Sequence, residues 1–324
     1  MTATTKIEQR AGSGTRGEFS ASLNLVHRGE TPVTIRYELA GSHDAPLLLV
    51  AGGISAGRHV IANTSDPAEG WWQVQSEAFR SCRLLAIDWL GADDTLDCPI
   101  ESLDQARAFL AALDHLQLPG AAAFVGASYG AMVGMQCAAI APARIPALLA
   151  IGAAHRSHPF TSAHRALQRQ VVELGERLGS PEEGVALARK LAILTYRTPQ
   201  EFAARFTTPT AIEDDRARAS SEPYLDHMGE KHSARMSAVA YRRLSESIDL
   251  HRIDPRTITV PATFVAADSD QLVPAADSEE LARAAPNGRF IRIQSLFGHD
   301  AFLKEERAVG GIIETFLTSL EQPK

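Results

Sequence analysis

Short apolar segments alternate with helical patterns along most of the chain. The apolar segments occupy residues 45–53, 82–91, 121–128, 145–155, 260–270 and 288–295, and several of them end in Gly, Ala, Ser or Asp. Because they are continuously apolar, they are typical of parallel strands in a sheet that helices cover on both faces. Residues 31–41 alternate between apolar and polar side chains, which predicts an early antiparallel strand. The sequence therefore predicts an α/β fold with a doubly wound, mostly parallel sheet.

The alternation stops between residues 156 and 254, where no segment has a clear strand pattern. The helical patterns there are rich in Arg, Glu and Ala, and we interpret this segment as an all-helical cap, or lid, inserted after the sixth strand. The core would then consist of residues 21–155 and 255–324, with a last helix near residues 305–320. Residues 1–20 are predicted to be a flexible N-terminal tail.

Charge and cysteine content argue against several classes of function. The net charge is −7 and no basic run occurs, so we expect neither a nucleic-acid partner nor an anionic membrane partner. No segment approaches the run of about 18 apolar residues that predicts a transmembrane helix, and the first residues have no apolar signal-peptide core. The three cysteines, Cys82, Cys98 and Cys137, have neither the number of a disulfide framework nor the spacing of metal ligands. We therefore expect no metal site and a location in the reducing cytoplasm.

One serine stands between two glycines where a predicted strand becomes a predicted helix. The pattern Gly-x-Ser-x-Gly occurs at Gly126, Ser128 and Gly130, and it is typical of a nucleophile elbow. The following helix would direct the partial positive charge of its N-terminus at Ser128, which favours an oxyanion there. The alternative is a tight strand–helix turn without chemistry.

A nucleophilic serine needs a histidine base and a carboxylate that orients the base. With this elbow, the chain order is expected to be Ser, then Asp or Glu, then His. Asp268 and Asp270 end a predicted strand after the cap, and His299 follows the last predicted strand. All three types of residue therefore lie at the C-terminal ends of parallel strands, where the sites of open α/β sheets form. This agreement favours the catalytic interpretation of Ser128.

The loop after an early strand, "AGGISAGRHV", is the expected source of one oxyanion-hole N–H group. Ile54 or Ser55 would supply that group, and the Tyr129 N–H would supply the second. The other histidines are weaker candidates for the base. His59 lies on this loop, while His155, His158 and His164 lie where the predicted cap begins and are expected to be peripheral.

At these positions the sequence resembles the homoserine O-acyltransferases of the α/β-hydrolase fold. The resemblance runs from about residue 33 to 317 and rests on the segments "AGGISAGRHVIAN", "GWW", "FVGASYGAMVGMQ", "ARKLAILTYRT", "DSDQLVP" and "GHDAFL". It implies that Ser128 is the nucleophile, His299 the base and Asp270 its partner. Asp270 is preferred to Asp268 because it directly precedes "QLVP".

The resemblance also assigns residues to the substrates. It implies that Arg189 holds the carboxylate of L-homoserine, that Asp300 holds its ammonium group, and that Tyr196 lies near the nucleophile. A guanidinium and a carboxylate at fixed positions would orient this zwitterion and exclude analogues. Without the resemblance, Arg189 would be read as a solvated helix charge and Asp300 as a residue that stabilises a helix N-terminus.

The implied reaction is ping-pong transfer through an acyl-Ser128 intermediate, with acyl-CoA as co-substrate and no metal or prosthetic group. The loop "GGISAGRHV" looks more like that of the succinyl-transferring branch, and Arg58 could then pair with the succinyl carboxylate. Residues 92–103 are shorter and more acidic than the corresponding family segment, so the donor stays open between succinyl-CoA and acetyl-CoA. The resemblance further implies a homodimer through the helical cap. The alternatives are an O-acyltransferase for serine, an esterase and a non-catalytic binding protein.

Overall fold

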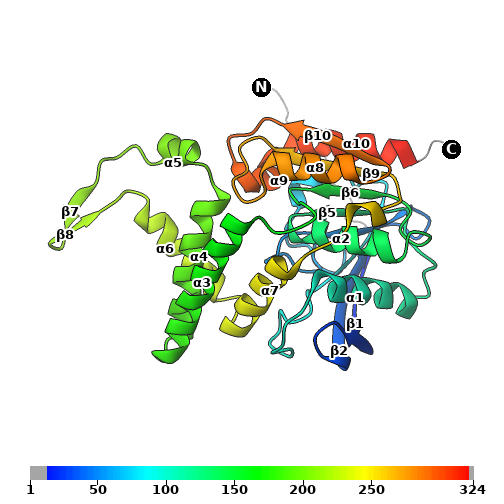
Figure 1. Cartoon of the computed structure of the whole chain (residues 1–324), viewed down its shortest axis with the longest axis horizontal. Helices are drawn as coiled ribbons and strands as arrows, with labels where there is room; N and C mark the ends of the chain where they lie inside the picture. The colour runs from blue at the N-terminus through cyan, green and yellow to red at the C-terminus, as the bar shows by residue number, and fades with distance from the viewer. Residues whose placement is uncertain (1–12, 321–324) are drawn as a thin grey trace, which may run out of the picture.

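The computed structural model describes residues 13–320, and its centre is an eight-stranded sheet with the order β1-β2-β4-β3-β5-β6-β9-β10 (Figure 1). The strands are β1 (Gly14–Leu25), β2 (Gly29–Ala40), β3 (Leu47–Ala51), β4 (Arg83–Ile87), β5 (Ala123–Ala127), β6 (Leu148–Ile151), β9 (Ala262–Ala267) and β10 (Gly288–Ile293). All strands from β4 to β10 in this order pair in parallel. The predicted mostly parallel α/β fold is confirmed.

The sheet begins with an antiparallel edge. β2 pairs antiparallel with β4, as its alternating pattern predicts, and β1 pairs antiparallel with β2 from Gly14↔Ala40 to Leu25↔Gly29. The prediction of a flexible tail over residues 1–20 is therefore wrong from Gly14 onward, while residues 1–12 lie outside the described residues. β1 is mostly exposed at the sheet edge, so it has few of the buried apolar side chains that mark a strand in a sequence.

Helices cover both faces of the sheet. The helices α1 (Ser102–His115), α2 (Tyr129–Ile140) and α8 (Ala275–Ala284) pack with one apolar cluster, which includes Phe109, Phe124 and Leu281. The helix α10 (Glu306–Leu320) packs with the other cluster, together with Trp72 and Phe79. Short helical turns lie at η1 (Gln73–Gln75), η2 (Pro255–Thr257), η3 (Gly298–Asp300) and α9 (Ala301–Lys304). The arrangement accounts for the continuously apolar parallel strands.

Five helices lie between β6 and β9 and extend to one side of the sheet (Figure 1). They are α3 (Pro159–Arg177), α4 (Pro181–Tyr196), α5 (Pro199–Arg205), α6 (Glu222–Ser233) and α7 (Ala238–Leu250), and we call residues 156–254 the cap. Pro at the first helical turn begins four of them, as its fixed φ favours. The cap is not entirely helical, because the short strands β7 (Ala211–Glu213) and β8 (Arg216–Arg218) form a hairpin. Over residues 13–320, no helix is long and apolar enough to cross a membrane.

Candidate active site

Ser128 lies on a strained turn between β5 and α2. Its backbone has φ 55° and ψ −121°, a conformation that non-glycine residues rarely adopt. The flanking glycines are required by close packing, because a Cβ atom on Gly130 would lie 2.2 Å from the Ala51 carbonyl oxygen. A Cβ atom on Gly126 would lie 2.5 Å from the Gly130 carbonyl oxygen. The Gly-x-Ser-x-Gly pattern therefore forms an elbow, which places the Ser128 hydroxyl at the edge of the sheet.

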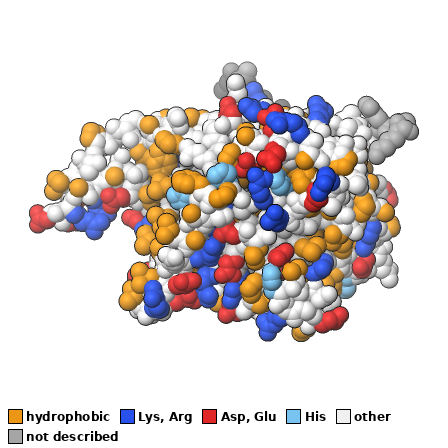
Figure 2. Space-filling model, viewed as in Figure 1, with side chains coloured by type: hydrophobic (Ala, Val, Ile, Leu, Met, Phe, Trp, Pro, Cys, Tyr) orange, Lys and Arg blue, Asp and Glu red, His pale blue; other side chains and the backbone are white. Residues whose placement is uncertain are grey.

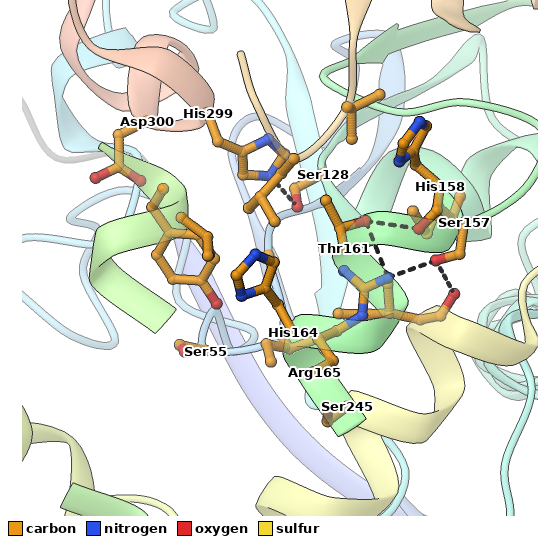
Figure 3. Close-up of a pocket in the computed structure, with 18 of the residues that line it drawn as sticks. Ser55, Ser128, Ser157, His158, Thr161, His164, Arg165, Ser245, His299 and Asp300 are labelled. Atoms are coloured by element: carbon orange, nitrogen blue, oxygen red, sulfur yellow. Dashed lines mark hydrogen bonds between the residues drawn. The ribbon is translucent and has the colours of Figure 1, made fainter. Parts of the chain in front are cut away.

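Ser128, His299 and Asp270 form one chain of hydrogen bonds. The Ser128 Oγ lies 2.7 Å from His299 Nε2, and His299 Nδ1 lies 2.7 Å from Asp270 Oδ2 (Figure 3 shows the first contact). The three residues follow β5, β10 and β9, so three parallel strands of one sheet bring them together. The hydrogen positions that favour Ser128 as a nucleophile are a proton on Nδ1, directed at Asp270, and a free Nε2.

The structure separates the two aspartates after β9. Asp270 is buried, and its Oδ1 accepts hydrogen bonds from the N–H groups of Leu272 and Val273 at 2.8 and 3.0 Å. These contacts fix the carboxylate so that Oδ2 is directed at His299. Asp268 is exposed and accepts a hydrogen bond from the Ser295 N–H instead. The structure thus brings Asp270, and not Asp268, to the histidine.

Two opposite effects act on the pKa of His299. Burial lowers the pKa because it disfavours the imidazolium, whereas the adjacent Asp270 carboxylate raises it, and the net effect is a raised pKa. A raised pKa makes His299 a stronger base once it is neutral. It also means that a step that needs neutral His299 slows as the pH falls through that pKa.

The predicted oxyanion donors lie beside Ser128. Tyr129 is the first residue of α2, so its N–H has no partner within the helix. Ile54 and Ser55 line the same pocket as Ser128. Their loop is fixed by Gly53, whose carbonyl accepts hydrogen bonds from Trp89 Nε1 at 3.0 Å and from the Ala56 N–H at 2.9 Å.

The pocket lies between the core and the cap. The core contributes Ser128, His299, Asp300, Ile54 and Ser55, among others. The cap contributes a second group, which includes Arg165, Arg189, Tyr196, His158 and His164. Figure 3 shows Asp300 and Arg165 on opposite sides of the Ser128–His299 pair. Within residues 13–320, no cluster of His, Cys, Asp and Glu has the arrangement of a metal site.

Arg189 is a pocket cation that lacks a carboxylate partner among the described residues. Its guanidinium lies 5.1 Å from the centre of the Tyr196 ring, and its buried Nε has no hydrogen-bond partner. The Tyr196 ring in turn lies 6.1 Å from the His299 ring. The predicted positions of Arg189 and Tyr196 therefore fall on one side of the pocket, near the histidine.

Asp300 is also in the pocket, but it is not free. Its Oδ2 pairs with Arg197 Nε at 2.9 Å. Burial raises the pKa of the Asp300 carboxyl, while Arg197, His299 and Arg189 lower it, and the net effect is a raised pKa. Sequence reasoning identified Asp300 and missed the arginine behind it.

Arg58 does not line the pocket, contrary to the role predicted for it. Its N–H donates to Asp88 Oδ1 at 2.8 Å, and its guanidinium lies 3.6 Å from Asp88 Oδ2. Asp88 directly follows β4, so a neighbouring strand directs Arg58 away from Ser128. The prediction that Arg58 reads a donor carboxylate does not fit this geometry.

Sequence reasoning also missed a polar face of α3. Thr161, His164, Arg165 and Gln168 all line the pocket, although the cap histidines were expected to be peripheral. Their spacing of three and four residues places them on one face of the helix, and this spacing was the available signal. Arg165 pairs with Asp249 at 2.7 Å and donates to the Ser157 hydroxyl at 2.7 Å (Figure 3 shows the Ser157 contact).

We predict a large difference between two asparagine variants. Asp270→Asn removes the partner of His299, and losing the corresponding carboxylate costs about 10⁴ in rate in serine proteases. Asp268→Asn changes an exposed carboxylate and is expected to cost less than about threefold, as surface changes usually do. The rate of acylation of Ser128 by a chromogenic ester measures both variants, and Ser128→Ala is the blank. Equal rates for the two asparagine variants would contradict the assignment of Asp270.

Comparison with known proteins agrees with this geometry. The family model for the alpha/beta hydrolase fold matches residues 46–306. The homoserine O-succinyltransferase of Xanthomonas campestris is 46% identical over 98% of this chain and 87% of its own length. The homoserine O-acetyltransferase of Thermus thermophilus is 34% identical over 68% of this chain and 58% of its own length.

Solved structures show the same fold. The homoserine O-acetyltransferase from Bacillus anthracis superposes with a TM-score of 0.84 at 15% identity, covering 96% of this chain and 98% of that chain. Esterase E22 superposes with a TM-score of 0.83 at 18% identity, covering 94% of this chain and 100% of that chain. The likeness in fold therefore does not separate a transferase from an esterase, whereas the sequence identity does. The chain belongs to the homoserine O-acyltransferase family, within the α/β-hydrolase fold.

Proposed function

We propose that the protein transfers the succinyl group of succinyl-CoA to the hydroxyl of L-homoserine, a step of methionine biosynthesis. The observation that carries the proposal is the hydrogen-bonded chain Ser128–His299–Asp270 in a pocket that also holds Arg165 and Arg189. A plain esterase has no need of two cations near its nucleophile. The relative from Xanthomonas campestris, named a homoserine O-succinyltransferase, supports the same reaction.

The first half of the reaction forms an acyl-enzyme. His299 takes the proton of the Ser128 hydroxyl while Oγ attacks the thioester carbonyl carbon of the acyl-CoA. The N–H groups of Tyr129 and of Ile54 or Ser55 stabilise the oxyanion of the tetrahedral intermediate. When the C–S bond breaks, His299 returns the proton to the sulfur and CoA leaves.

The second half transfers the acyl group to the acceptor. The homoserine hydroxyl gives its proton to His299 and attacks the ester carbonyl of acyl-Ser128. The intermediate collapses, His299 protonates Ser128 Oγ, and the O-acyl product leaves. Asp270 stabilises the imidazolium in both halves. Acyl-CoA is the co-substrate of this route. Because His299 carries the proton in each step, the route calls for no metal or prosthetic group.

The acceptor would bind on the side of the pocket that holds Arg189, Tyr196 and Asp300. Arg189 has no carboxylate partner among the described residues, so it is suited to the homoserine carboxylate. Asp300 would accept the ammonium group with the carboxylate oxygen that Arg197 does not occupy. Tyr196 would hold the Arg189 guanidinium in place through its ring face.

The donor carboxylate would bind on the opposite side, at Arg165. Arg165 and Arg169 both pair with the single carboxylate of Asp249, each at 2.7 Å, so this cluster keeps a net positive charge. The Arg165 side chain is 12% exposed and lines the pocket, so it can meet a charged acyl group in a largely dry site. A succinyl carboxylate buried there needs such a partner, because an unpaired buried charge costs several kcal/mol. We therefore assign to Arg165 the role that the sequence suggested for Arg58.

We predict that the two half-reactions respond differently to Arg189. Wild type is expected to release CoA from succinyl-CoA in a burst of one equivalent and to turn over when L-homoserine is added. Arg189→Leu should keep the burst and lose about 1.5–3 kcal/mol, or roughly 10- to 150-fold, in kcat/KM for homoserine. Thiol release measured with homoserine, with serine and with water alone tests the proposal. Equal turnover with water would indicate an esterase, and faster turnover with serine would indicate the alternative acceptor.

We predict that Arg165 sets the choice of donor. Wild type should prefer succinyl-CoA to acetyl-CoA in kcat/KM, and Arg165→Met should lose that preference by slowing the succinyl reaction by about 10-fold or more. Arg58→Ala is the matched control, because it removes an arginine of the core that does not line the pocket. A wild type that prefers acetyl-CoA would overturn the donor. A preference that is lost in Arg58→Ala and kept in Arg165→Met would indicate that Arg58, and not Arg165, binds the donor carboxylate.

We also propose that a second copy of this chain covers the outer face of the cap. Leu167 and Leu174 are exposed on one face of α3, and Leu178 is exposed directly after its end; Leu187, Leu191 and Leu194 are exposed on one face of α4. Hydrophobic side chains over the cap are visible in Figure 2. An apolar surface of this kind on neighbouring helices is typical of an interface between subunits. The homodimer implied by the resemblance would bury it.

We predict that the dimer depends on these leucines. Leu174→Glu combined with Leu191→Glu places a charge on each helix face and should convert the protein to a monomer in sedimentation velocity. Val26→Glu is the control, because Val26 is exposed in the turn after β1 and is not part of the cap. A monomeric wild type, or a double variant that stays dimeric, would contradict this interface.

A further inference from the structure

The residue pair Arg197–Asp300 joins the cap to the loop that carries His299. Arg197 follows α4, and Asp300 directly follows His299 in η3. The guanidinium is nearly buried, with 12% of the side chain exposed, and its Nε lies 2.9 Å from Asp300 Oδ2. Asp300 lines the pocket, whereas Arg197 does not, so Arg197 stands behind the carboxylate as seen from the substrate.

Arg197 is held from the other side by Glu201. Its Nη1 pairs with Glu201 Oε1, and Lys304 pairs with the same oxygen at 2.9 Å. Glu201 is buried and lies in the first turn of α5. Successive ion pairs therefore connect Asp300, Arg197, Glu201 and Lys304. Of the two carboxylates, that of Asp300 lines the pocket.

The backbone around this pair leaves little freedom. The Thr198 hydroxyl donates to the Leu296 carbonyl at 2.6 Å, which ties the cap to the core one residue after Arg197. A Cβ atom on Gly298 would lie 2.7 Å from the Tyr196 carbonyl oxygen, so the two segments touch through their backbones. Arg197 and Asp300 are thus fixed relative to each other by contacts on both sides.

We propose that Arg197 is a positioning residue that holds the Asp300 carboxylate ionised and oriented for the ammonium group of the acceptor. The inference rests on the proposed function, in which Asp300 binds that group. A buried carboxylate without a partner tends to take up a proton, and a neutral carboxyl cannot pair with an ammonium. Arg197 occupies one oxygen of Asp300 and leaves the other for the substrate.

The charges that face Asp300 support this role. Burial raises the pKa of Asp300, and the charged neighbours lower it, with Arg197 first, followed by His299, Arg189 and Lys304. Removing Arg197 takes away the largest lowering effect, so the pKa of Asp300 rises further. More of the carboxyl is then protonated at neutral pH, and raising the pH restores the ionised form.

The test compares the two half-reactions across pH 6 to 8.5. Arg197→Met should raise KM for homoserine by about 10- to 100-fold at neutral pH, as the loss of a charged contact does. The burst of CoA from succinyl-CoA should change by less than about threefold, because the proposed function places the donor carboxylate at Arg165, on the other side of the pocket. The KM for homoserine should fall more steeply with rising pH in Arg197→Met than in wild type. Dividing each transfer rate by the acylation rate at the same pH removes the common titration of His299.

Two further variants separate charge from fold. Thr198→Val removes the hydrogen bond to the Leu296 carbonyl and the one from the Glu201 N–H without removing a charge, and it should keep the wild-type pH profile. Arg197→Lys retains a cation and should keep that profile too, with a smaller rise in KM. If Arg197→Met does not fold, Arg197→Gln replaces it in the same measurement. The glutamine also removes the cation but retains a hydrogen-bond donor.

Each outcome decides the inference. A pH profile of Arg197→Met or Arg197→Gln that parallels wild type would overturn it, as would a Thr198→Val profile that shifts in the same way. A wild type that releases CoA but does not transfer to homoserine would refute the proposed function itself, and with it the ammonium role of Asp300. A shift confined to the variants that lack the Arg197 cation supports the inference.

Discussion

The close contact between Gly130 and β3 is the constraint on which the site depends. The Gly130 N–H donates to the Gly52 carbonyl at 2.7 Å, and a Cβ atom on Gly130 would collide with the Ala51 carbonyl oxygen. The contact presses the start of α2 against the end of β3, so the Tyr129 N–H and the loop that carries Ile54 face the same point. Ser128 stands at that point because its backbone is held at a positive φ. One backbone contact thus sets the positions of Ser128 and of the loop that carries Ile54, before any polar side chain is considered.

The polar side chains then divide the work between core and cap. The core supplies the hydrogen-bonded chain of Ser128, His299 and Asp270 from the ends of parallel strands. The cap supplies the pocket cations Arg165 and Arg189 from α3 and α4. The strand ends are fixed by the sheet, whereas the cap is a separate insertion, so these two groups of side chains come from different parts of the fold.

Sequence patterns predicted those features of the structure that depend on residues close together in the chain. The apolar strands, the elbow and the order Ser128, Asp270, His299 follow from patterns within a few residues and from the edge at which parallel strands end. β1 was missed because its pairing with β2, rather than its own composition, makes it a strand. Arg58 was misplaced because its direction is set by Asp88, which is 30 residues away in the chain. The polar face of α3 has a visible helical spacing, but only the docking of the cap shows that this face meets the pocket.

The ion pair of Arg197 and Asp300 is likewise difficult to find from a sequence motif. Arg197 lies within the segment "ARKLAILTYRT" that carries the resemblance, yet a motif assigns importance without direction. Its role depends on the burial of Asp300, on the oxygen that it occupies, and on Glu201 behind it. A zwitterionic acceptor requires an ionised carboxylate in a site dry enough for acyl transfer, and these two requirements oppose each other. A second cation outside the pocket reconciles them, because it favours the charge without competing for the face that the substrate needs.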